Sequence, residues 1–329
     1  MAQNIDTKNL VSHEKVTFLT IDEASETQKI DNFLLKVLKN VPKSHIYKIL
    51  RNGEVRVNKK RVDTTYRLKL EDLVRIPPIT IGEQKTRAIE TPKTQQTVWL
   101  ETHIIYEDDA LLAINKPSGY AVHGGSGLSF GVIELIRHVR PQAKFLELVH
   151  RIDRDTSGIL LIAKKRSALV NMHEMMRHNQ IEKKYTMMVQ GLWTEPKKTV
   201  ELMLKKTLNK TGERRVHVTE DEGDEDQQLS KSIFYLRKVI GPYSLLEAKL
   251  ITGRTHQLRV QLSHLGFPIL GDYKYGDFKL NKSLEKNGLK RMFLHAFSMK
   301  MKHPMTGELL EIKASLSPEL DAFLSQCHS

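Results

Sequence analysis

The amino-acid sequence predicts an α+β protein in which a mixed, mostly antiparallel sheet follows a small basic module of two helices and short strands. Apolar side chains recur at helical spacing within residues 29–51, and from Trp99 onward short apolar runs alternate with turns and helical segments. With 329 residues, the chain is long enough for two domains. We therefore divide it into a flexible arm, 1–21, a small domain, 22–80, a linker, 81–98, and a main domain, 99–329.

The arm shows no sustained period, and we expect regular structure to begin near Lys29. One helical face collects the apolar residues that follow, namely Ile30, Phe33, Leu34, Val37 and Leu38. Pro42 suits the first turn of a second helix, and Asn52-Gly53 is a typical helix end. Residues 55–58 and 73–76 then predict short strands, so the module alternates between the two classes of element.

Positive charge gathers in this module. Residues 29–76 contain 13 Lys or Arg against 5 Asp or Glu, while the whole chain carries a formal net charge of +13. Such a field attracts polyanions, although a solvated basic surface without a ligand is the alternative.

Residues 30–34, 44–53 and 55–58 resemble the RNA-binding module named after ribosomal protein S4. The resemblance implies an S4-type α/β module that meets structured RNA through charge and shape. The candidate RNA-binding residues are Lys43, Lys48, Arg51, Arg56, Lys59, Lys60 and Arg61.

The linker is polar and without an apolar period, and the main domain begins after it. We expect strands at 104–106, 111–114, 159–163, 185–189 and 245–251, with helices between them, for instance at 167–178. This order favours an antiparallel or mixed sheet.

Composition narrows the class of protein. The single cysteine, Cys327, permits neither an intramolecular disulfide nor a thiolate metal cluster. No apolar run approaches the roughly 18 to 20 residues of a membrane span, and Met1 to Leu10 lack a signal-peptide core. We expect a cytoplasmic protein without a membrane partner.

Three motif clusters carry the candidate chemistry: residues 115–119, residues 150–158, and residues 252–260 with Gly271-Asp272 and Tyr275-Gly276 beyond them. In the second, Asp153 stands between Arg151 and Arg154, directly before an apolar strand. A nearby guanidinium favours the ionised carboxylate, and a fixed, ionised carboxylate can act as a nucleophile or base. A structural ion pair at the strand entrance is the alternative.

Two other readings use the same residues. Asp153 and Asp155 could form a glycosidase pair, but an i, i+2 spacing is a common accident, and a 6% aromatic content disfavours a sugar groove. His150 with the same two carboxylates could bind a metal, but the spacing is not typical of zinc. We therefore expect no metal site.

Taken together, the three clusters resemble the RluA-type pseudouridine synthases over residues 22–329. The resemblance implies that Asp153 is the catalytic aspartate, that Tyr185 stacks on the uracil, and that Arg259 pairs with Asp153. It further implies that Arg151 enters the RNA stack where the target uridine leaves it, and that Ile152 and Leu258 line the uracil pocket. It implies no cofactor, because substrate and product are isomers.

The implied activity is the isomerisation of specific uridines to pseudouridine in 23S ribosomal RNA, at several sites near the peptidyl transferase centre. The partner would be 23S ribosomal RNA or a large-subunit assembly intermediate, bound by a monomer. The sequence leaves open the target uridines, and whether Asp153 attacks the ribose or the uracil. Ile152, Leu258 and Gln261 depart from the usual family residues, which leaves substrate detail open. A non-catalytic RNA-binding or assembly factor is the alternative, but a pure binder does not need an aspartate held against an arginine.

Overall fold

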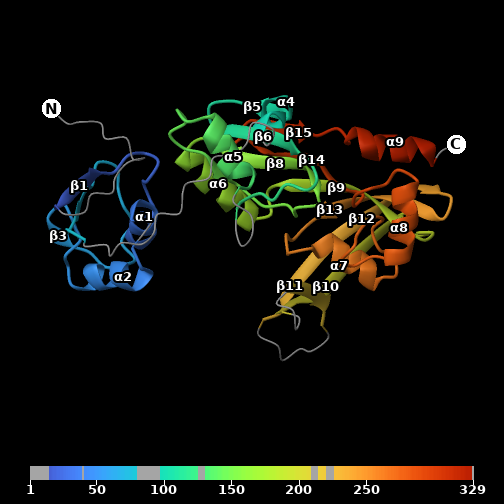
Figure 1. Ribbon diagram of the computed structural model, residues 1–329, viewed down its shortest axis with the longest axis horizontal. Coiled ribbons are helices and arrows are strands. Elements are labelled where there is room, and N and C mark those ends of the chain that lie inside the picture. Colours follow the sequence, from blue (N-terminus) through green and yellow to red (C-terminus); the bar gives the residue numbers. More distant parts are fainter. Residues whose placement is uncertain are drawn as a thin grey trace. The chain divides into compact units, whose positions relative to one another are not determined.

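The computed structural model describes residues 15–38, 41–79, 97–124, 130–208, 214–219 and 226–327. The chain divides into two compact units, Met1–Thr91 and Pro92–Ser329 (Figure 1). Each unit has a hydrophobic core of its own.

The N-terminal unit packs two helices against a small sheet. Its elements are β1 (Thr17–Thr20), α1 (Ile30–Val37), α2 (Lys43–Arg51), β2 (Arg56–Val57), β3 (Lys60–Arg61) and β4 (Leu73–Ile76). The strands lie in the order β1-β4-β2-β3, and every pairing is antiparallel. The predicted apolar faces of α1 and α2 are buried in one core with side chains of β2 and β4. The two helices and the strands after them are therefore confirmed.

The predicted arm, 1–21, ends too late. Thr17–Thr20 forms β1, which pairs Thr17 with Ile76 and Thr20 with Leu73, and Ile21 is only 1% exposed. Four residues are too few to display a two-residue period, so the sequence alone could not separate this strand from an arm. Residues 1–14 of the arm lie outside the described residues.

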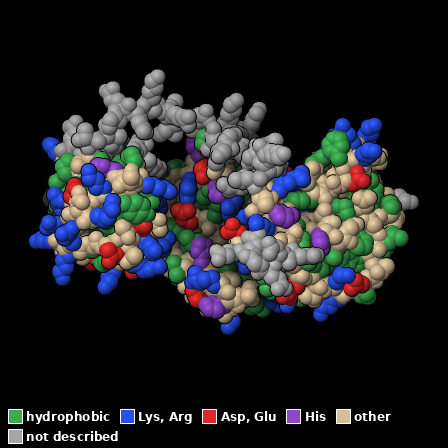
Figure 2. All heavy atoms as spheres, turned by 90° about the horizontal axis from the view of Figure 1, so that it is seen from below, with side chains coloured by type: hydrophobic (Ala, Val, Ile, Leu, Met, Phe, Trp, Pro, Cys, Tyr) green, Lys and Arg blue, Asp and Glu red, His purple; other side chains and the backbone are tan. Residues whose placement is uncertain are grey.

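All seven candidate RNA-binding residues of this unit are exposed. Lys48 and Arg51 lie on α2, whose other face buries Ile46 and Ile49. Arg61 Nη2 donates to the Arg51 carbonyl at 2.9 Å, which holds β3 beside the end of α2. Lys and Arg side chains cover much of the face of this unit seen in Figure 2. Their contact with RNA stays a prediction.

The C-terminal unit is built on a long sheet. Its strands are β5 (Ile104–Glu107), β6 (Leu111–Lys116), β7 (Glu147–Leu148), β8 (Ser157–Ala163), β9 (Glu182–Gln190), β10 (Lys197–Leu208), β11 (Arg214–Val218), β12 (Gln228–Ile240), β13 (Tyr243–Leu250), β14 (Leu294–Lys302) and β15 (Leu309–Lys313). The main path runs β11-β10-β12-β13-β9-β14-β8-β6-β5, with β15 on β14 and β7 on β8. Among the described strands only β8 and β14 pair in parallel, so the predicted mixed, mostly antiparallel sheet is confirmed.

That parallel ladder is short and close. It joins His295 to Ser157 and Ala296 to Gly158. Gly158 has φ +106°, and a Cβ there would lie 2.2 Å from the Ala296 carbonyl oxygen. Only glycine permits this backbone and this approach. Arg291 Nη2 also donates to Ser157 Oγ at 2.7 Å across the same joint.

Helices pack against the part of the sheet that contains β6 and β8 and against the part that contains β9, β13 and β14. They are α4 (Trp99–Thr102), α5 (Val132–Val139), α6 (Arg166–Arg177), α7 (Gln257–His264), α8 (Phe278–Lys286) and α9 (Pro318–Gln326). Apolar residues of α5 pack with β6 and β8, and those of α7 pack with β9, β13 and β14. Side chains of α8 and α9 share a third core cluster with Met188 of β9.

The predicted linker, 81–98, lies outside the described residues except for positions 97 and 98. The division between the two units falls within this range. Among the described residues, no helix has the length and apolar content needed to cross a membrane.

Candidate active site

Asp153 lies in the turn that leads into β8. The Thr156 N–H donates to the Asp153 carbonyl at 3.2 Å, which closes this turn directly before the buried strand. The Asp153 side chain is 25% exposed and lines a cleft of about 1550 Å³ within the C-terminal unit. The carboxylate is thus held by backbone geometry yet open to a large ligand.

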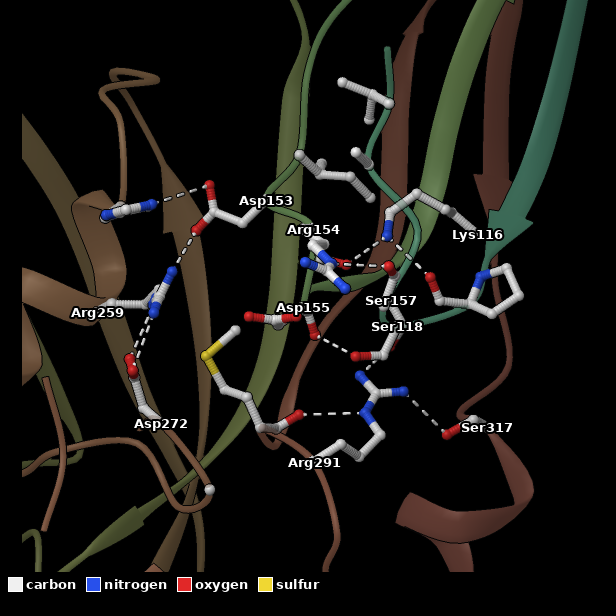
Figure 3. A pocket seen from close by; sticks show the side chains of 18 of the residues that line it. Lys116, Ser118, Asp153, Arg154, Asp155, Ser157, Arg259, Asp272, Arg291 and Ser317 are labelled. Carbon is white, nitrogen blue, oxygen red and sulfur yellow. Dashed lines mark hydrogen bonds and ion pairs between the residues drawn. The ribbon is translucent and has the colours of Figure 1, made fainter. Parts of the chain in front are cut away.

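Arg259 connects Asp153 to a second carboxylate. Its Nη1 donates to Asp153 Oδ2 at 3.1 Å, while Nε and Nη2 donate to the two oxygens of Asp272 at 2.7 and 2.9 Å (Figure 3). Arg259 comes from α7, 106 positions after Asp153. The structure therefore brings together the aspartate and the arginine named by the resemblance, and their catalytic roles stay a prediction.

Pairing keeps Asp272 and Arg259 charged although both are buried. Burial acts to raise the pKa of Asp272, but the hydrogen bonds and charge of Arg259 outweigh it and hold the pKa below its usual value. Burial likewise acts to lower the pKa of Arg259, and the two carboxylates raise it instead. Because Arg259 and Asp272 are only 6% and 1% exposed, the pair is little screened by water.

A small pocket of about 80 Å³ opens beside Asp153. Its walls include all three predicted base-contact residues besides Arg151, namely Tyr185, Ile152 and Leu258, each less than 10% exposed. Burial and the Asp153 charge both raise the pKa of Tyr185, so its phenol keeps the proton. A small pocket with apolar and aromatic walls next to a carboxylate suits an unstacked pyrimidine.

Arg151 and Arg154 flank Asp153 in the sequence but differ in their surroundings. Arg151 is exposed and lines both the cleft and the small pocket, where a planar cation can meet RNA bases. Arg154 Nε instead donates to the Gly119 carbonyl at 2.9 Å. The arginine that hydrogen-bonds Asp153 is thus Arg259, from a distant part of the chain.

Lys116 stabilises the turn that carries Asp153. The side chain is 0% exposed, and Nζ donates to the carbonyls of Pro117, Tyr120 and Arg154 at 2.8, 2.9 and 3.0 Å. Burial lowers its pKa to about 7, helped by the charge of Arg291 and opposed by those of Asp155 and Asp153. The lysine therefore ties the first motif cluster to the turn that carries Asp153.

His150, the histidine of the alternative metal site, has a structural role in this fold. His150 accepts a hydrogen bond from the Leu161 N–H at 3.1 Å, and burial lowers its pKa to about 4, so this ring is a neutral structural group. Among the described residues, no group of three or more His, Cys, Asp or Glu side chains could hold a metal ion.

Sequence reasoning missed two residues of the site. Asp272 anchors Arg259, and Tyr275 hydrogen-bonds His256, which in turn lies 3.9 Å from Asp153. Both stand in the third motif cluster, but their side-chain partners are set by tertiary packing. In the sequence, the signal available was the pair Gly271-Asp272. The structure explains the glycine: Gly271 has φ +75°, and a Cβ there would lie 2.2 Å from the Arg291 carbonyl oxygen.

The fold and site agree with sequence similarity. Residues 110–264 match the family described as RNA pseudouridylate synthase, and residues 28–74 match the S4 domain. A relative from Pasteurella multocida (strain Pm70) is 49% identical over 324 residues, which cover 98% of this chain and 97% of the relative. The chain therefore belongs to the RNA pseudouridylate synthase family and is an enzyme of that class.

That relative bears the name ribosomal large subunit pseudouridine synthase C, as does one from Haemophilus influenzae that is 48% identical over 96% of both chains. Among solved structures, human RNA Pseudouridylate Synthase Domain Containing 1 aligns with a TM-score of 0.55 and 25% identity, covering 67% of this chain and 86% of that one. Human RNA Pseudouridylate Synthase Domain Containing 4 aligns with a TM-score of 0.58 and 23% identity over 71% and 95%, which supports the fold alone.

Proposed function

We propose that this enzyme converts specific uridines of 23S ribosomal RNA into pseudouridine, at several sites near the peptidyl transferase centre. The names of the relatives that match along nearly the whole chain support the large ribosomal subunit as the source of the RNA. The observation that carries the proposal is the Asp153–Arg259 pair beside a slot walled by Tyr185 and Leu258.

The proposed reaction is an isomerisation that needs no net input of atoms. The bond between uracil N1 and ribose C1′ breaks, the base turns, and C5 bonds to C1′; C5 loses a proton and N1 gains one. Asp153, hydrogen-bonded by Arg259, provides the carboxylate that acts on the reacting sugar or base. Tyr185 lies against the uracil in the slot, and its protonated phenol assists loss of the C5 proton as a hydrogen-bonding group rather than as a base.

The target nucleotide has to leave the RNA stack before this chemistry can occur. Extracting a base costs a few kcal/mol, and a planar cation inserted into the gap recovers part of that cost. Arg151, exposed at the mouth of the cleft, is the residue we assign to the gap. Ile152 and Leu258 provide the apolar walls on which the extracted uracil rests.

We assign RNA affinity to the S4-type module. Its seven exposed cations would neutralise phosphates on free 23S ribosomal RNA or on a large-subunit assembly intermediate, and binding should weaken steeply with salt. We expect a monomer acting in the cytoplasm.

The test is to map pseudouridines in 23S ribosomal RNA from a strain that lacks this protein, and then to restore the wild type, Asp153→Asn or Asp155→Asn. The wild type and Asp155→Asn should restore the missing pseudouridines, because the exposed Asp155 lines the cleft but has no part in the proposed chemistry. Asp153→Asn should restore none although it binds RNA as the wild type does. Restoration by Asp153→Asn would refute the proposed role, and unchanged RNA in the deletion strain would refute the substrate.

A further inference from the structure

Asp153 has a second neighbour besides Arg259. His256 Nε2 lies 3.9 Å from Asp153 Oδ1, whereas Arg259 Nη1 donates to Asp153 Oδ2. The two oxygens of the carboxylate therefore face two different side chains. His256 precedes α7 as its N-cap and stands three positions before Arg259, so both side chains reach the same carboxylate from one end of one helix.

The backbone of His256 is unusual. It has φ +53° and ψ +21°, in the left-handed region that non-glycine residues adopt rarely. Strain of this kind persists where the surrounding structure over-determines it, commonly at functional sites. Here the conformation aims the ring into both the cleft and the small pocket.

Tyr275 determines which ring nitrogen of His256 carries the proton. Tyr275 Oη accepts a hydrogen bond from the Val216 N–H at 3.1 Å and lies 2.7 Å from His256 Nδ1. Burial raises the pKa of Tyr275, so the phenol keeps its hydrogen. A phenol hydrogen directed at Nδ1 gives both groups a partner, because the Val216 amide already donates to the phenol oxygen, and the neutral imidazole then carries its hydrogen on Nε2.

The neutral form of the ring follows from its surroundings. Burial lowers the pKa of His256; the charges of Asp153 and Asp272 oppose this, and those of Arg259 and Lys274 assist it. The Nε2–H of a neutral ring then faces Asp153 Oδ1 as a donor. Without the phenol, the lone pair of Nε2 could face the carboxylate instead, which is repulsive.

One buried carboxylate, that of Asp272, supports both side chains that face Asp153. Asp272 Oδ1 accepts from Arg259 Nη2 at 2.9 Å and from the Tyr275 N–H at 3.1 Å. Asp272 thus connects to Asp153 Oδ2 through Arg259, and to Asp153 Oδ1 through Tyr275 and His256. Tyr275 also packs with Val216 and Val260, so β11, at the edge of the sheet, is part of its support.

We propose that His256 is a positioning residue for Asp153: Tyr275 fixes it as an Nε2–H donor, and it hydrogen-bonds Asp153 Oδ1 when RNA fills the cleft, so that both carboxylate oxygens are held for the reaction. This inference rests on the proposed function of Asp153. In the free protein His256 Nε2 lies 3.9 Å from Asp153 Oδ1, and rotation of one side chain is enough to shorten this distance to that of a hydrogen bond. The second hydrogen bond fixes the plane of the carboxylate, which a single bond from Arg259 leaves free to turn.

The tautomer gives a test that does not depend on activity. In ¹⁵N-histidine-labelled full-length protein, the two-bond proton–nitrogen spectrum should show His256 with its hydrogen on Nε2. In Tyr275→Phe the same ring should shift toward a mixture of tautomers. A wild-type ring protonated on Nδ1, or a spectrum unchanged in Tyr275→Phe, would overturn the proposal whatever the enzyme's substrate is.

Turnover provides the second test, with 23S ribosomal RNA from a strain lacking the enzyme, labelled with tritium at uridine C5, as the probe. His256→Asn keeps a residue that tolerates the left-handed backbone but removes the imidazole. Its kcat should fall about 10- to 100-fold, as expected for losing a hydrogen bond to a charged group, with KM nearly unchanged. His256→Gln, whose longer side chain carries its terminal N–H donor further toward Asp153 than Asn does, should recover part of the loss.

Unfolding midpoints of these variants separate positioning from stability. Midpoints near that of the wild type together with a reduced kcat would support the proposal. A kcat within twofold of the wild type in His256→Asn, or a loss confined to KM, would overturn it. If the wild type itself released no tritium from this RNA, the proposed function would fail, and the tautomer experiment would still decide the hydrogen-bond arrangement.

Discussion

Asp272 is the residue whose replacement tests the site most directly. Its carboxylate accepts hydrogen bonds from Arg259 Nε and Nη2 at 2.7 and 2.9 Å, and from the Lys274 and Tyr275 amides at 2.9 and 3.1 Å. Asp272→Asn keeps the size and one acceptor oxygen. It replaces the other oxygen by an amide that faces the N–H groups of Arg259, and it leaves that guanidinium with Asp153 as its carboxylate partner.

The expected loss of stability follows from burial. Removing one partner of a buried ion pair destabilises a protein by about 3–5 kcal/mol, because an uncompensated charge stays inside. Arg259 is 6% exposed and retains Asp153, which is 25% exposed, so we expect about 3 kcal/mol, the lower end of that range. The kcat for pseudouridine formation should fall at least tenfold, because Arg259 can turn away from Asp153.

Urea unfolding measures the first effect and tritium release from C5-labelled RNA the second. Asp277→Asn is a matched control: Asp277 is the N-cap of α8, exposed, and accepts from the Lys279 and Leu280 amides. Since Asn is as good an N-cap as Asp, this variant should change stability by less than about 0.5 kcal/mol.

The pH dependence has a defined sign. The folded pKa of Asp272 is lowered, so its contribution is present above the unfolded value near 4 and is lost as the pH falls through the folded pKa. The difference in unfolding free energy between wild type and Asp272→Asn should therefore shrink below about pH 4. An Asp272→Asn protein as stable as Asp277→Asn at neutral pH, with unchanged kcat, would refute the reasoning.

Three further predictions concern Lys116, Tyr185 and helix α2. Lys116→Met should lower the unfolding free energy at pH 7 by roughly 3 kcal/mol, because three buried carbonyls lose their donor. The folded pKa of Lys116, about 7, lies below its unfolded value, so the unfolding free energy of the wild type should rise with pH between about 7 and 10. Denaturation of Lys116→Met over the same pH range should show no such rise. Tyr185→Phe should bind RNA normally in filter binding yet release C5 tritium at least tenfold more slowly, and equal rates would exclude a role for its phenol. Replacing both Lys48 and Arg51 by Glu should weaken binding to 23S ribosomal RNA and reduce the slope of log affinity against log salt by about 2, with Lys69→Glu as a control outside α2; an unchanged slope would argue against contact through α2.

Much of the fold could be predicted because the relevant patterns are local. The apolar face that begins at Ile30 and the apolar run at 159–163 each specify an element without help from the rest of the chain. Strand β1 could not be predicted, since its four residues become a strand only by pairing with β4, more than 50 positions later. The predicted end of the arm, at residue 21, was wrong for that reason.

The site was predictable in its residue types and less so in its partnerships. Asp153 could be singled out because it precedes a buried strand, but proximity in the sequence pointed to Arg151 and Arg154 as its cations. The resemblance pointed to Arg259, and the structure places that residue at the carboxylate. The roles of Asp272, Tyr275 and His256 depend on contacts between α7, the segment after it and β11, and a single sequence does not encode such contacts as a pattern.

The short parallel ladder between β8 and β14 has a consequence for how this enzyme can be divided. Asp153 lies directly before β8, on one side of the β8–β14 pairing, whereas Tyr185 of β9 and Arg259 of α7 lie on the other side of that pairing. Neither half of the sheet, expressed by itself, contains both charges of the reacting centre. A split version of the protein should regain turnover only when its two fragments reassemble at Gly158 and Ala296, which would make restored turnover a direct readout of that assembly.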